Sequence, residues 1–178
     1  MCGMELDPVY TEALTPREFL GVYAHQSHDI QSVRVMPPVL GERGFGRILV
    51  ERNAAGEERP LAGEKYYIPG SLLRVAVDTT ASIAWGSPPA VDVMFDDSPV
   101  FRLASDARAK GVTPLAWYET ATPLRSGWAW GQHYLEGGIA AAEAKIGQGR
   151  LLLYGPEVLF RAQPHGTFKL VFNALTGY

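Results

Sequence analysis

The chain has 178 residues and a mass of 19.4 kDa, which is the size of one domain. Apolar residues make up 47% and the net charge is −3, so we expect a hydrophobic core and no nucleic-acid-binding surface. The 19 glycines and 13 prolines predict many turns and short elements, and no apolar run reaches the ~18 residues of a membrane span.

Residues 1–45 differ from the rest of the chain because they show little hydrophobic periodicity. We expect this segment to be poorly structured or of unrelated origin, and residues 46–178 to form one C-terminal domain. Cys2 is the only cysteine, so no disulfide can form within the chain and no cysteine-based zinc cluster is expected. The N-terminus does not have the pattern of a signal peptide, and the sequence does not identify the cellular compartment.

Beyond residue 46 the sequence predicts a series of short strands. The segment 71–78 alternates between its two faces as a strand does, and residues 139–146 and 150–154 predict a β-hairpin around a Gly-Gln-Gly turn. Pro114 lies within the apolar segment 112–118 and indicates an edge strand or a bulge. Further strands are expected at 47–51, 90–95 and 100–103, and a helix is expected within 165–175.

The helix expected at the end of the chain is amphipathic. Its apolar residues recur at i, i+3, i+4 and i+7, which is the spacing of one helix face: Phe168, Val171, Phe172 and Leu175. We expect the phenylalanines of this face, together with Phe160, to be buried in the core.

His133 and Glu136 form a His-x-x-Glu motif, whose two side chains share one side of a helix. With His165 they supply two histidines and one carboxylate, a donor set that suits catalytic zinc. The motif is short and common, and a surface helix with ordinary hydrogen bonds gives the same pattern. A small metal-dependent hydrolase that uses these three residues is therefore one alternative function.

Trp128 and Trp130 lie in a segment that also contains Ser126. The segment is not a nucleophile elbow, because Arg125 and Trp128 occupy the places where that motif needs glycine. The two tryptophans, with Tyr134, are typical of a face that stacks on a glycan or a peptide. The simpler interpretation packs one tryptophan in the core and uses the glycines for turns.

Arg161 and His165 precede the expected helix, whose N-terminus offers free N–H groups and a positive potential. Together they predict a place where a carboxylate or a phosphate binds. The alternative is a capped helix in which Arg161 pairs with a nearby acid.

Three longer strings carry a resemblance to one family. They are residues 65–78 (KYYIPGSLLRVAVD), 123–138 (PLRSGWAWGQHYLEGG) and 149–175 (GRLLLYGPEVLFRAQPHGTFKLVFNAL). In order and spacing they resemble the C-terminal region of long bacterial zinc carboxypeptidase-like metallopeptidases. The resemblance covers about residues 47–176, and its most specific part is the last string.

The resemblance implies an accessory domain rather than a catalytic one. In that family the zinc-binding peptidase domain lies upstream, and the region matched here resembles the α/β fold of class I glutamine amidotransferases. His133-x-x-Glu136 falls in this accessory segment and is not the family's zinc motif. The nucleophilic cysteine of amidotransferases has no counterpart, because Cys2 lies outside the matched residues. Zinc is therefore implied only for a catalytic domain that is absent from this chain.

From these observations we expect an α/β or α+β fold: a β-rich, partial amidotransferase-like domain closed by a C-terminal helix. The expected function is that of a non-catalytic accessory domain, the distal fragment of a larger protein with an unrelated or misassigned beginning. Its expected partner is the missing peptidase domain or the upstream polypeptide, with neither nucleic acid nor a membrane span involved. Full-length proteins of this kind are often exported.

Overall fold

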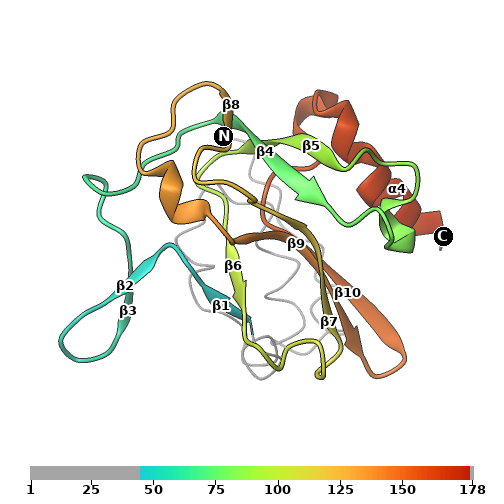
Figure 1. Ribbon diagram of the computed structural model, residues 1–178, viewed down its shortest axis with the longest axis horizontal. Coiled ribbons are helices and arrows are strands. Elements are labelled where there is room, and N and C mark those ends of the chain that lie inside the picture. Colours follow the sequence, from blue (N-terminus) through green and yellow to red (C-terminus); the bar gives the residue numbers. More distant parts are fainter. Residues whose placement is uncertain (1–44, 177–178) are drawn as a thin grey trace, which may run out of the picture.

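The computed structural model of the protein describes residues 45–176, so the expectations for residues 1–44, Cys2 included, lie outside it. Element labels follow Figure 1. The strands are β1 (Phe45–Arg47), β2 (Val50–Arg52), β3 (Glu58–Pro60), β4 (Ser71–Val77), β5 (Ala90–Phe95), β6 (Phe101–Leu103), β7 (Val112–Trp117), β8 (Leu124–Ser126), β9 (Ile139–Ile146) and β10 (Gly149–Tyr154). The helices are the 3-10 turns η2 (Ser82–Ala84), η3 (Gln132–Leu135), η4 (Phe160–Ala162) and η5 (His165–Thr167), and the α-helix α4 (Phe168–Thr176).

Most strands belong to one curled sheet, and β2 and β3 form a separate hairpin that projects from it (Figure 1). β4 pairs with β5 on one side and with β7 and β8 on the other, and β9 pairs with β7, β10 and β6. Every strand pair within residues 45–176 is antiparallel. The fold is therefore β-rich and of the α+β class, and not an α/β fold built on parallel strands in this part of the chain.

The strands predicted from alternation are confirmed. Buried residues alternate along β4 and β5, and the β9–β10 hairpin closes where Ile146 pairs with Gly149. The single strand expected at 47–51 is wrong, because the structure has two short strands there. β1 pairs with β6 in the main sheet, whereas β2 pairs with β3, so the chain must change direction between them.

β7 is an interior strand, but Pro114 pairs with β9 alone, because the ladder with β4 covers only Ala116 and Trp117. β7 has β4 on one side and β9 on the other, and its register with β9 shifts between Pro114 and Ala116. Proline has no N–H to donate to the ladder, and the bulge accommodates that missing donor. The bulge expected from the sequence is confirmed, and Pro114 itself has a strand partner on one side only.

The C-terminal helix forms where it was expected, but the face it turns to the core is not the predicted one. Leu170 and Asn173 face the core, whereas Phe172 is 56% exposed and Leu175 is 78% exposed. The Asn173 amide donates to the carbonyl oxygens of Ile83 and Trp85, at 2.8 and 2.9 Å. These hydrogen bonds hold the side of α4 that carries Asn173 and the buried Leu170 against η2, so Phe172 and Leu175 face outward. The expected burial of Phe160 and Phe168 is also wrong, because both are only partly buried.

Candidate functional site

Both tryptophans of the segment 127–131 are on the surface. Trp128 is 61% exposed and Trp130 is 55% exposed, so the interpretation that packs one of them in the core is wrong. Tyr134, expected to join them, is also exposed. Large aromatic side chains in this state are uncommon away from binding surfaces, which makes the segment a candidate site. We call residues 127–131 the tryptophan loop.

A buried serine fixes the first half of the tryptophan loop. Ser71 is 1% exposed, and its Oγ accepts the N–H of Trp128 at 2.9 Å and donates to the carbonyl oxygen of the same residue at 2.6 Å. Gly127 has a φ of +101°, and a Cβ there would lie 2.6 Å from Ser71 Oγ. Only glycine fits this position, so the loop keeps one backbone conformation beside β4.

The second half of the loop is fixed against the segment before β4. Trp130 and Tyr67 exchange two backbone hydrogen bonds of 3.0 Å, and the Trp130 indole Nε1 donates to the carbonyl oxygen of Glu64 at 2.8 Å. A Cβ on Gly131 would lie 2.1 Å from the carbonyl oxygen of Lys65. Because its neighbours are locked in this way, the loop presents two tryptophans in a defined arrangement.

Tyr67 is a surface residue that the sequence analysis missed. It is exposed, and it lies directly opposite Trp130 in an antiparallel pair, so the two side chains share one face. Its neighbour Tyr66 is buried. No local signal distinguishes these two tyrosines, because the pairing partner lies far along the chain.

The His-x-x-Glu motif does not lie on a regular helix. His133 is part of the short turn η3, whereas Glu136 follows the end of that turn in an extended conformation. The His133 ring packs on Tyr134 with 4.3 Å between ring centroids. Among residues 45–176, no three His, Cys, Asp or Glu side chains form a group that holds a metal, so His133, Glu136 and His165 are not brought together.

Arg161 and His165 lie in two successive 3-10 turns before α4, η4 and η5. Arg161 and Ala162 have φ values of +45° and +55°, which side-chain-bearing residues rarely adopt. The Arg161 guanidinium lies over the Phe160 ring at 5.1 Å, His165 Nε2 is 3.0 Å from the carbonyl oxygen of Ala162, and the His165 ring packs on Phe168. The two predicted anion ligands lie in neighbouring turns, and each of them contacts an aromatic ring.

A groove that the sequence analysis did not predict lies beside these turns. Its volume is about 560 Å³, and it runs between the outer face of β4 and β5 and the segment 160–166. The lining is mostly apolar: Leu72, Pro88, Ala90, Val91, Met94, Phe160, Pro164 and Gly166, with Arg74, Asp92 and Gln163 as its polar members. A second cavity of about 480 Å³ has a more polar lining that includes Asp78, Glu143, Lys145 and Arg150.

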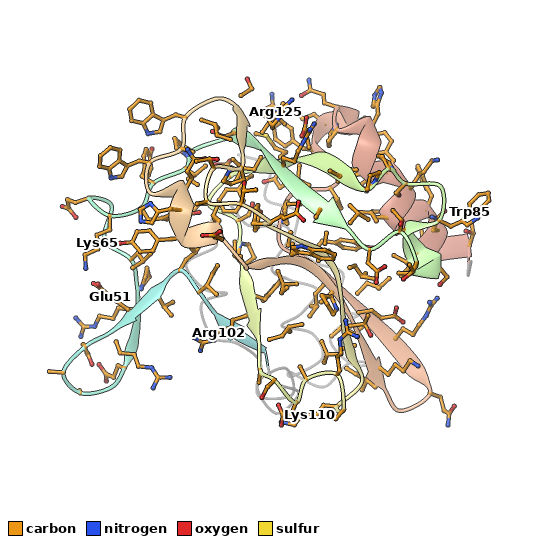
Figure 2. All side chains as sticks on the ribbon, in the orientation of Figure 1. Glu51, Lys65, Trp85, Arg102, Lys110 and Arg125 are labelled. Atoms are coloured by element: carbon orange, nitrogen blue, oxygen red, sulfur yellow. The ribbon has the colours of Figure 1, made fainter. Side chains whose placement is uncertain are left out.

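The charges of the groove centre on Asp92. Arg74 donates from Nε and Nη2 to the two carboxylate oxygens of Asp92, at 2.9 and 3.3 Å, and these contacts raise the pKa of Arg74 above its usual value. Arg125 Nε lies 3.7 Å from Asp92 Oδ1, too far for a hydrogen bond. Figure 2 shows Arg125 near β8, at the upper end of the sheet.

Exposed apolar side chains also gather along α4. Phe168 and Phe172 are in edge-to-face contact at 6.1 Å, and Leu175 continues the same side of the helix. Trp85 is exposed and lies beside α4, since its carbonyl oxygen accepts from Asn173 (Figure 2). We call Phe168, Phe172, Leu175 and Trp85 the α4 surface.

Comparison of the chain with family models, with curated proteins and with solved structures finds no match. No helix within residues 45–176 has the length and apolar character that crossing a membrane requires. Three surface features are therefore candidates for a function: the α4 surface, the tryptophan loop and the groove beside β5.

Proposed function

We propose that this chain is a non-catalytic accessory domain of a zinc carboxypeptidase-like peptidase, built on a partial amidotransferase-like fold. One observation carries the proposal: the fold leaves two large apolar side chains of α4 on the surface. Phe172 and Leu175 lie on the surface while Leu170 and Asn173 face the core. A helix with this orientation is complementary to a second apolar surface and not to water alone.

The α4 surface has the chemistry of a contact between domains. It combines two phenylalanines, a leucine and Trp85, and aromatic residues of this kind are enriched at the centres of protein interfaces. The string that carries the most specific family resemblance, residues 149–175, contains most of α4. We infer that the occupant of this surface is the polypeptide that carries the peptidase domain.

The proposal is tested by mixing the full chain with a separately expressed zinc carboxypeptidase-like catalytic domain from the same organism. Sedimentation velocity should show a one-to-one complex. Phe172→Glu should weaken it at least tenfold, because a charge would be buried at the contact. Ile146→Glu is the matched control, since it adds the same charge at another exposed apolar residue, on the β9–β10 hairpin. Absence of a complex, or equal weakening by both variants, would contradict the proposal.

The rigidity of the tryptophan loop favours a second candidate, a glycan- or peptide-binding module. Trp128 and Trp130 are exposed although their backbone is fixed by Ser71, Tyr67 and two required glycines. A preorganised aromatic face loses little conformational entropy on binding. Titration with soluble glucose and N-acetylglucosamine oligosaccharides, followed by tryptophan fluorescence, tests this function. Binding that Trp128→Ala abolishes and Trp85→Ala leaves intact is the expected result, and no saturable change would exclude these glycans.

A further inference from the structure

The groove beside β5 combines an apolar floor with a rigid wall. Leu72 and Met94 are directly opposite each other across β4 and β5, so their side chains lie together on the outer face of the sheet. Phe160 and Pro164 form the opposite wall. Phe160 begins η4, in which Arg161 and Ala162 have positive φ values, and Pro164 follows this turn. Strain of this kind is retained where the surrounding structure requires one geometry.

The lining of the groove carries one ion pair, Arg74 with Asp92, and two further guanidinium groups, of Arg125 and Arg161, lie next to lining residues. Asp92 is its one acidic lining residue, and both of its oxygens already accept hydrogen bonds from Arg74. Arg125 reaches Asp92 only at 3.7 Å, and Arg161 lies over the Phe160 ring at 5.1 Å. The Asp92 carboxylate therefore has two guanidinium groups near it, and Arg161 packs on Phe160 of the opposite wall. The guanidinium of Arg125 keeps donors that match a second carboxylate.

We propose that this groove binds a small amphipathic carboxylate, with its apolar body on Leu72, Met94 and Phe160 and its carboxylate on Arg125. The volume of about 560 Å³ is in the range of small-molecule sites. An apolar lining with a few convergent polar groups is the usual composition of such sites. The inference does not depend on the accessory function, because the α4 surface and the groove have different lining residues.

The test uses 3-phenylpropionate as the probe and 3-phenylpropionamide as its uncharged analogue of the same shape. Saturation-transfer NMR with the full chain should show that the acid binds at least tenfold more tightly than the amide, since only the acid makes a charge-assisted hydrogen bond. Arg125→Gln should reduce the acid to the affinity of the amide and leave the amide unchanged. Arg150→Gln is the matched control, because Arg150 lines the other cavity.

If Arg125→Gln fails to fold, the salt dependence of binding to the unaltered protein still tests the proposal. Raising sodium chloride from 0.05 to 0.5 M, roughly a threefold drop in the screening length, should weaken the acid and not the amide. Equal affinity for the acid and the amide would overturn the proposal, as would absence of binding at 10 mM probe. Binding of the acid that survives Arg125→Gln, or that Trp128→Ala abolishes, would overturn it as well.

Discussion

Replacing Ser71 by alanine tests the most specific structural claim about the tryptophan loop. In the folded protein the Ser71 hydroxyl satisfies both the N–H and the C=O of Trp128, and the serine itself is almost fully buried. The alanine variant leaves these two backbone groups without their partner. Both hydrogen bonds are partly buried, and each contributes about 0.5–1.5 kcal/mol net. We therefore expect a loss of about 1–3 kcal/mol of unfolding free energy, measured by urea denaturation.

Ser87→Ala is the matched control for this experiment. The Ser87 hydroxyl is also buried, but it has no hydrogen-bond partner within the described residues. The same chemical change should therefore leave stability unchanged or raise it slightly, because no partner is lost. If the two variants differ by less than about 0.5 kcal/mol, the clamp on Trp128 does not hold the loop, and the argument from its rigidity fails.

Three further predictions concern stability. Tyr118→Phe should leave the unfolding free energy unchanged or raise it by about 1 kcal/mol, because the hydroxyl is buried without a partner in the described part of the chain; a loss of that size would show a hidden hydrogen bond. Stability should fall above pH 10, by about 1.4 kcal/mol per pH unit for each tyrosine kept neutral, and urea titrations at pH 9 and pH 11 measure this fall. Burial raises the pKa of Tyr66 and Tyr118 and brings that of Tyr154 to about 12. As the pH rises, these tyrosines therefore lose their protons in the unfolded chain before they do so in the folded protein. An unfolding free energy that does not change between pH 9 and pH 11 would contradict this prediction. Gly131→Ala should cost more than about 2 kcal/mol in thermal or urea unfolding, since it adds a Cβ at positive φ against a carbonyl oxygen, and a neutral result would refute this geometry.

The strands were predictable because their signal is local. Alternation along 71–78 and the Gly-Gln-Gly turn after Ile146 reflect properties of the strand itself, and the structure confirms β4 and the β9–β10 hairpin. Pro114 also acts locally, through its missing N–H. The assignment of 1–45 and 46–178 as separate regions stays a prediction, since the structure describes only residues 45–176.

The orientation of α4 was not predictable from its own residues. Hydrophobic periodicity identifies an apolar face, but it does not say what covers that face. In this fold two carbonyl oxygens near η2 bind the Asn173 amide, and this tertiary contact sets the rotation of the helix. The prediction that failed, the burial of Phe172, concerns the same helix that carries the proposed domain contact.

The surfaces of the candidate site depend on contacts between distant parts of the chain. Trp128 is held by Ser71, and the groove joins β4 and β5 to the segment 160–166. A single sequence does not reveal such pairs. His133 and Glu136 show the limit of a short motif, because a spacing that suits a helix falls on a short turn that ends before the glutamate.

Peptide hydrolysis is the most direct test of the claim that this chain supports a catalytic domain and is not one itself. The full chain and the catalytic domain are assayed separately and together, with and without added zinc. The account predicts no turnover by the chain alone, and hydrolysis only when the catalytic domain is present. Zinc-dependent hydrolysis by the chain alone, lost in His133→Ala, would contradict it.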